Sequence, residues 1–276
     1  MKRDDKAEVA RQWDGDPCGA VTAAPVEPES AAWYASVRDY RYRLYAPWMR
    51  QALNFGRSRD KDVLEIGVGL GSDHLLLAES GARMTALDLS REHLRHTSKH
   101  LEYCGLSTKA TLGDAERMPF PDGSFDLVYS FGVLHHTPGT RQAISEVHRV
   151  LRPGGTALIA LYHRHSFFFW LSTIGVSGIL KLGLIRKGWR RLLSEIEYRS
   201  SENTAVPLVK VYSRRQVRRL FRDFGQVAIV AHHVEGGHFP LIGQVLARRL
   251  SRDWFERYLG FGGWYLVVEA SKALAP

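Results

Sequence analysis

The apolar positions follow two alternating periodicities from residue 60 onwards. Short apolar runs, typical of strands buried on both faces, occupy residues 63–66, 84–87, 109–112, 125–130 and 156–161. Between them, apolar residues recur at helical spacing in 72–80, 90–104 and 140–151, and each of these segments ends at a glycine or proline. Strands that alternate with helices predict an α/β fold with a mostly parallel sheet, covered by helices on both faces.

The pattern changes on both sides of this region. Residues 1–30 contain three prolines and predict irregular structure, whereas residues 31–55 have helical spacing. The alternation stops at residue 163, and residues 163–212 begin apolar and become basic. Ser213 and Gln216 then form a predicted capping box at the start of a helix, and strands are predicted over 226–234 and 264–270.

A glycine-rich loop follows the first predicted strand, where residues 63–72 read VLEIGVGLGS. Glycines let the backbone take positive φ and let a ligand approach closely, and the following helix offers free N–H groups. The G-x-G-x-G spacing differs from the G-x-G-x-x-G of dinucleotide-binding turns. Glu65 would repel a pyrophosphate and suits a cationic ligand, such as a sulfonium with an α-ammonium group. A turn that binds no ligand is the alternative interpretation.

Two further acids follow the next two predicted strands. Asp88 ends the second strand, where a carboxylate can accept both hydroxyls of a ribose. Asp114 follows the third strand and can accept the exocyclic amine of adenine, with the backbone of Ala115 beside it. The alternatives are a helix cap or turn residue at Asp88 and an unrelated turn at Asp114.

Five sequence blocks occur in order over residues 60–162: VLEIGVGLGSD, TALDLS, GDAERMPF, FDLVYSFGVLHH and RVLRPGG. Together they resemble the type 11 group of class I S-adenosylmethionine-dependent methyltransferases, which includes the ubiquinone and menaquinone C-methyltransferases. The resemblance implies a Rossmann-like seven-stranded sheet, mostly parallel with an antiparallel last strand. It also implies S-adenosylmethionine as cofactor, bound at the carboxyl ends of the strands, and S-adenosylhomocysteine as by-product.

The resemblance also implies which residues bind this cofactor. The acid on the first strand and the loop glycines would surround the methionine part, and the acids after the second and third strands would hold the ribose and the adenine. Ser130, Phe131 and His135, at and after the end of the fourth strand, would line the methyl-transfer side. The implied set is Glu65, Gly67, Gly69, Gly71, Asp88, Leu89, Asp114, Ala115, Ser130 and Phe131. The stretch WDGDPCG over residues 13–19 resembles N-terminal segments that close over the cofactor in related enzymes.

These observations divide the chain into four predicted parts. Residues 1–58 form an N-terminal lid and helix over the cofactor, and 59–162 form the cofactor-binding Rossmann-like half. Residues 163–212 form an inserted helical cap. Residues 213–276 complete the sheet, with a helical insertion between the last two strands.

Histidines supply the candidate catalytic groups. Methyl transfer from a sulfonium is an in-line displacement, which needs a base only if the acceptor must lose a proton. His135, His136, His163 and His165 all follow predicted strand ends, where active sites of such sheets lie. We expect His135 first and His163 second to act on the acceptor; a capping or surface role is the alternative for each. The residues around them favour transfer to oxygen or carbon.

Charge and apolar runs point to the kind of acceptor. The formal net charge is +9, and residues 181–257, with 16 Lys and Arg against 7 Asp and Glu, carry this whole excess. Uncharged residues 166–180 precede a basic stretch, and residues 239–257 repeat this arrangement. We expect segments 166–191 and 239–257 either to contact an anionic membrane or to form an apolar roof over a soluble acceptor. The uncharged run is too short to span a bilayer.

Other features limit the functional classes. Cys18 and Cys104 are the only cysteines and give neither a disulfide framework nor a zinc spacing, so the sequence predicts no metal site. The charged start MKRDDKAEVARQW lacks the apolar core of a signal peptide, which predicts a cytoplasmic, or membrane-peripheral, protein. An RNA methyltransferase acting on tRNA nucleosides and a non-catalytic, cofactor-binding partner subunit remain alternatives. Basic residues interleaved with apolar ones favour a small or lipophilic acceptor over nucleic acid.

Overall fold

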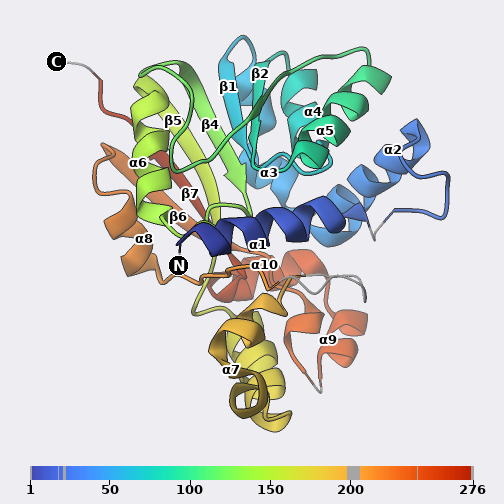
Figure 1. Ribbon diagram of the computed structural model, residues 1–276. Coiled ribbons are helices and arrows are strands. Elements are labelled where there is room, and N and C mark those ends of the chain that lie inside the picture. The colour runs from blue at the N-terminus through green and yellow to red at the C-terminus, as the bar shows by residue number, and fades with distance from the viewer. Residues whose placement is uncertain (1, 18, 21–22, 198–205, 241, 275–276) are drawn as a thin grey trace.

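The computed structural model describes residues 2–17, 19–20, 23–197, 206–240 and 242–274. A seven-stranded sheet in the order β3-β2-β1-β4-β5-β7-β6 forms the centre of this described part (Figure 1). Its strands are β1 (Asp62–Ile66), β2 (Arg83–Asp88), β3 (Lys109–Leu112), β4 (Phe125–Phe131), β5 (Leu151–Tyr162), β6 (Gln226–His232) and β7 (Tyr265–Ser271). β7 is antiparallel to β5 and β6, and the other pairs are parallel. The predicted Rossmann-like sheet is therefore confirmed.

Helices cover both faces of the sheet because successive strand residues point to opposite sides. Val63 packs into one core with α3 (Met49–Leu53) and α4 (Ser72–Glu79). Leu64, the next residue along β1, packs into the other core with α6 (Thr140–Val150) and α8 (Arg214–Leu220). α5 (Arg91–Tyr103) contacts β2 and β3 and adds Leu101 to the first core. The predicted capping box of Ser213 and Gln216 is confirmed at the start of α8.

The N-terminal part differs from its prediction. Residues 1–30 were expected to be irregular, yet α1 spans Lys2–Gly15. Lys6, Val9, Ala10 and Trp13 recur at helical spacing, and all four line one cavity, so tertiary packing stabilises this very polar helix. Pro17, Pro25 and Pro28 lie beyond its end. α2 (Ala31–Asp39) and the π-helical segment η2 (Tyr40–Tyr45) follow, and the 3-10 turn η3 (Phe55–Ser58) precedes β1.

The fifth strand is longer than its prediction. The sequence predicts residues 156–161, but β5 begins at Leu151, which pairs with Phe125 before the register shifts along β4. The sequence pattern predicts Pro153, Gly154 and Gly155 only as a stop for the preceding helix. The backbone instead enters the sheet directly after α6 ends.

The segments after β5 and β6 project together from one end of the molecule (Figure 1). The first holds the π-helical segment η4 (Phe168–Leu180) and α7 (Gly183–Ser194), which is kinked at Gly188. The second holds η5 (Gly236–His238), α9 (Gly243–Arg249), α10 (Arg252–Leu259) and η6 (Gly260–Gly262). No helix in the described part of the chain is long and apolar enough to cross a bilayer. The division of the chain at residues 58, 162 and 212 stays a prediction.

Candidate active site

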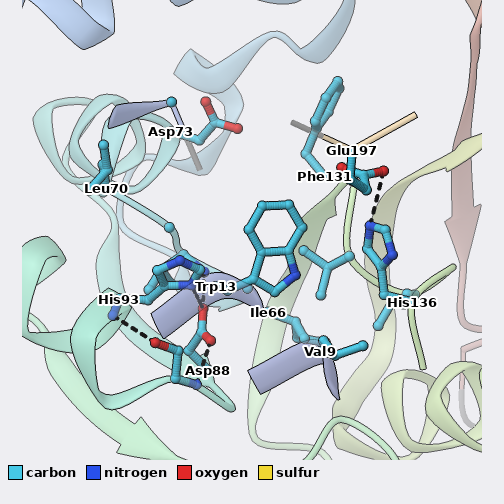
Figure 2. Close-up of a pocket in the computed structure, with 18 of the residues that line it drawn as sticks. Val9, Trp13, Ile66, Leu70, Asp73, Asp88, His93, Phe131, His136 and Glu197 are labelled. Atoms are coloured by element: carbon cyan, nitrogen blue, oxygen red, sulfur yellow. Dashed lines mark hydrogen bonds and ion pairs between the residues drawn. The ribbon is translucent and has the colours of Figure 1, made fainter. Parts of the chain in front are cut away.

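A cavity of about 660 Å³ opens at the carboxyl ends of the parallel strands. Its walls come from α1, from the loops after β1, β2, β3 and β4, and from the segments that follow β5 and β6. This volume is within the range of sites for cofactors and small molecules. Figure 2 shows Trp13 of α1 between His93 and His136, near the centre of the cavity.

The glycine loop after β1 forms one wall. Gly67, Gly69 and Gly71 have φ values of 77°, 53° and 76°, a region that side chains other than glycine rarely adopt. Gly67 and Gly69 line the cavity, but Gly71 does not. A Cβ on Gly71 would lie 3.1 Å from the Cα of Thr97. Gly71 therefore positions the loop against α5.

Glu65 lies at the end of β1 and lines the cavity. Its Oε2 is 2.8 Å from Nδ1 of His74, and the other ring nitrogen of His74 is 2.8 Å from the hydroxyl of Thr108. Burial, reinforced by the nearby carboxylates of Asp73 and Asp88, raises the pKa of Glu65 well above its usual value. Burial also lowers the pKa of His74 to about 3, so this ring is neutral. An arriving cation would favour the ionised form of Glu65.

Asp88 is held in one orientation by three hydrogen bonds. Its Oδ2 accepts from the backbone N–H of Val68 at 2.8 Å and is 3.2 Å from Nδ1 of His93, and its Oδ1 accepts from the N–H of Ser90 at 2.9 Å. Burial alone would raise the pKa of Asp88, but His93 and these N–H donors outweigh it and lower the pKa. A carboxylate has about four acceptor positions. Asp88 therefore keeps capacity for a ribose hydroxyl.

Asp114 and Ala115, which follow β3, line the cavity, as does Leu89 after β2. Lys6 of α1 forms an ion pair with Asp114 and another, at 2.9 Å, with Glu116. The N-terminal helix thus contacts the acid predicted to hold adenine.

Ser130 and Phe131 end β4, but only Phe131 lines the cavity. The hydroxyl of buried Ser130 donates to the carbonyl of Ile66 at 2.9 Å, which ties β4 to β1. The guanidinium of Arg41 lies 4.9 Å from the centre of the Phe131 ring.

Arg41 and Asp73 form an ion pair that the sequence did not indicate. Two nitrogens of Arg41 donate to the two oxygens of Asp73, each at 2.6 Å. The hydroxyls of Tyr42 and Tyr129 also donate to Asp73. Burial would raise the pKa of Asp73, but Arg41 and these donors lower it. Asp73 follows the last loop glycine by two residues and lies in the first turn of α4. This position is the only sequence signal that could have identified Asp73 as part of the site.

The predicted catalytic histidines do not line the cavity. His135 is fully buried beneath Tyr162, with 3.6 Å between ring centres. His163 is buried, with its Nδ1 2.9 Å from the carbonyl oxygen of Gly263. His136 is the histidine of the adjacent pair that lines the cavity. Catalytic roles for His135 and His163 stay predictions.

Aromatic side chains dominate the end of the cavity away from Asp88. Tyr45, Tyr162, Phe168, Trp264 and Tyr265 all line it, and the hydroxyls of Tyr45 and Tyr265 lie 2.6 Å apart. Polar groups are interspersed among these rings; they are His136, Glu197, His233, Glu235 and His238. Such a wall suits an acceptor with a large apolar part and a few polar atoms.

Comparisons with known proteins agree with this geometry. A family model described as a methyltransferase domain matches residues 64–159. The chain is 36% identical over 107 residues to a sterol 24-C-methyltransferase from Gibberella zeae, which covers 38% of this chain and 28% of that protein. It is 35% identical over 141 residues to a probable tocopherol O-methyltransferase from Oryza sativa subsp. japonica, covering 48% and 39%. The chain therefore spans less than half the length of these relatives.

Solved structures share the fold over a longer stretch. An S-adenosylmethionine-dependent methyltransferase from Methanosarcina mazei superposes with a TM-score of 0.53 at 19% identity, covering 82% of this chain and 98% of that one. The [4+2]-cyclase SpnF gives the same TM-score at 15% identity, covering 98% and 92%. At this level of identity the likeness establishes the fold alone.

Proposed function

We propose that this chain, whose residues 64–159 match a methyltransferase-domain model, is a class I S-adenosylmethionine-dependent methyltransferase of the type 11 group that methylates a small or lipophilic acceptor. S-adenosylmethionine is the cofactor, and S-adenosylhomocysteine is the proposed by-product. The observation that carries the proposal is the row of three carboxylates along one cavity: Glu65, Asp88 and Asp114.

The described residues fit the cofactor. Glu65 would face its α-ammonium group, Asp88 retains acceptor capacity for a ribose hydroxyl, and Asp114 with Ala115 would hold the adenine. Bound S-adenosylmethionine supplies an electrophilic methyl group on a sulfonium. The protein then has to hold the acceptor in line and exclude water.

The aromatic wall supports a lipophilic acceptor. Two relatives that match part of this chain are named for sterol and tocopherol methylation. Methylation of oxygen or carbon remains the proposal for this chain. His135 and His163 remain proposed catalytic residues; neither side chain lines the cavity as described, so each would need another group or a rearrangement to reach the acceptor.

A binding measurement tests whether the chain binds S-adenosylmethionine as proposed. Asp88→Ala removes hydrogen-bond acceptors for the ribose and should weaken S-adenosylmethionine binding by about 1.5–3 kcal/mol in calorimetry. Asp122→Ala is the matched control, because Asp122 is exposed and contacts Arg149 away from the cavity. Undiminished affinity in folded Asp88→Ala would contradict the ribose assignment.

Methyl labelling of cell extract tests which class of acceptor the protein methylates. We expect label from S-adenosylmethionine in the lipid or small-molecule fraction, and less of it with Asp88→Ala. Label in RNA would instead support a tRNA nucleoside methyltransferase. Cofactor binding without label in any fraction would support a non-catalytic partner subunit.

We also propose peripheral contact with an anionic membrane through segments 166–191 and 239–257. Their large apolar side chains include several that are more than half exposed: Trp170, Ile179, Leu180, Leu182, Ile185, Ile242 and Val245. Leu241 lies outside the described residues. Basic residues accompany both segments, as an interfacial surface requires. The cytoplasmic location stays a prediction.

A further inference from the structure

Two histidines and a glutamate from distant parts of the chain meet at the cavity wall. His135 and His136 follow β4, and Glu197 follows α7. One nitrogen or oxygen atom from each lies within 4.8 Å of the others. Nε2 of His136 is 3.6 Å from Oε1 of Glu197, and the two imidazole centres are 4.3 Å apart. Figure 2 marks the contact between His136 and Glu197 with a dashed line.

Three of the four ring nitrogens of this cluster are buried without a hydrogen-bond partner among the described residues. Both nitrogens of His135 and Nε2 of His136 have no hydrogen bond within the described part of the chain. Buried polar atoms almost always have a partner, and leaving them unpaired destabilises the fold. One nitrogen of each ring lies within 4.8 Å of a carboxylate oxygen of Glu197, a spacing that a shared ligand could bridge.

Two of the three side chains, His136 and Glu197, have the outer partners typical of metal ligands. Nδ1 of His136 lies 2.7 Å from the carbonyl oxygen of Leu208, so in the neutral ring this nitrogen carries the proton and Nε2 carries the lone pair. The hydroxyl of Tyr162 donates to Oε1 of Glu197 at 2.7 Å. Metal-bound histidines commonly donate their second N–H to a carbonyl, and metal-bound carboxylates are themselves hydrogen-bonded.

We propose that His135, His136 and Glu197 bind one divalent transition-metal ion, with Zn²⁺ as the first candidate. Two imidazoles and one carboxylate are a ligand set used for zinc and for iron(II). Tetrahedral zinc with bonds of 2.0–2.1 Å places its ligand atoms about 3.3 Å apart, close to the separation of His136 and Glu197. The sequence did not indicate this site, because its ligands are separated by some sixty residues and include no cysteine.

Three protein ligands leave one position of a tetrahedral ion open. His136 and Glu197 line the cavity, so the open position faces the space proposed for the acceptor. An oxygen atom of the acceptor is the class of ligand that such a position would take. This last step rests on the proposed function, whereas metal binding itself does not.

A second cluster in the same cavity provides a control. His233, Glu235 and His238 also place one atom each within 4.8 Å. Their groups are already engaged, since Arg252 lies 3.2 Å from Glu235 and Nε1 of Trp48 donates to Nδ1 of His233 at 3.3 Å. Among the described residues, the cluster of His135, His136 and Glu197 therefore has more free lone pairs than the cluster of His233, Glu235 and His238.

Metal titration tests the site without knowledge of the acceptor. Chelator-treated full-length protein should bind one equivalent of Zn²⁺ by calorimetry, and one of Co²⁺ with visible absorption bands. Glu197→Gln and His136→Ala should each weaken binding by more than about 100-fold, because even the loss of an outer partner weakens a site 10–100-fold. Tyr162→Phe should weaken it less, and His238→Ala should leave it unchanged.

Circular dichroism and S-adenosylmethionine binding, measured on each variant, establish that the protein is folded. Wild-type protein that binds cofactor but no stoichiometric metal would overturn the metal site while leaving the proposed function intact. Metal binding that survives both Glu197→Gln and His136→Ala, or that is lost in His238→Ala, would also overturn it. Metal binding without cofactor binding would contradict the proposed function and not this site.

Discussion

Asp73 shows how a single buried charge depends on its partners. Its carboxylate accepts hydrogen bonds from Arg41, Tyr42 and Tyr129, and it lies in the first turn of α4. A carboxylate near a helix N-terminus is favoured by the helix dipole, but desolvation opposes it. Arg41 is therefore the group whose loss would leave an uncompensated charge beside the cofactor site.

We expect Arg41→Met to lower the free energy of unfolding by about 3–5 kcal/mol, the usual effect of breaking a buried ion pair. Arg43→Met provides the control. Arg43 lies on the same segment but is exposed and 3.3 Å from Asp39, so its loss should change stability by less than about 0.5 kcal/mol. Urea unfolding of both variants measures the difference. Equal effects would show that Asp73 does not need Arg41.

The element whose position matters most to the site is α1, which crosses in front of the strand ends (Figure 1). Its residues contact the loops that follow three strands. Trp13 lies 6.3 Å from the ring of His93 and 5.8 Å from that of His136. Asp14 accepts a hydrogen bond from Ser90, and Lys6 pairs with Asp114. Cys18 of the WDGDPCG stretch lies outside the described residues.

This arrangement predicts that α1 retains the cofactor. Trp13→Ala should speed dissociation of S-adenosylmethionine about tenfold, equivalent to about 1.4 kcal/mol, with a smaller change in association. Stopped-flow displacement measures both rates. Trp170→Ala is the control, since Trp170 is half exposed on η4 and does not line the cavity. An unchanged dissociation rate in Trp13→Ala would mean that α1 does not cover the bound cofactor.

At the scale of the whole molecule, many of the exposed apolar residues lie on the segments that follow β5 and β6. η4, α7 and α9 carry them, and these elements lie together below the sheet in Figure 1. Lys181, Arg186 and Arg248 belong to the same segments. A surface that combines exposed rings, aliphatic side chains and cations suits the headgroup region of an anionic bilayer.

Vesicle flotation checks this surface. The protein should float with anionic vesicles but not with neutral ones, and binding should weaken as salt rises, since charges are screened over about 10 Å at 0.1 M and 3 Å at 1 M. Ile185→Asp, at a side chain 83% exposed on α7, should reduce flotation. Leu274→Asp should not, because Leu274 is similarly exposed, at 78%, but follows β7 and lies outside both segments. Failure to float at low salt would leave these segments as a roof over a soluble acceptor.

The sequence by itself determined the sheet and the glycine-loop wall of the cavity. Strand runs, the glycine loop and the acids that end β1 and β2 are encoded by short-range patterns, because strand periodicity and positive φ depend on nearby residues. The predicted cofactor set lines the cavity except for Gly71 and Ser130. Gly71 contacts Thr97 and Ser130 bonds to Ile66, and both contacts depend on distant segments.

Only the tertiary structure decided the rest of the site. His135 and His136 are equivalent in sequence, but the turn after β4 buries the first beneath Tyr162 and presents the second to the cavity. Arg41 reaches Asp73, and Glu197 approaches His136, through packing between segments far apart in the chain. The polar helix α1 is likewise formed against the cavity that it covers. Local patterns could not predict these contacts, because their energy comes from burial and pairing that exist only in the folded chain.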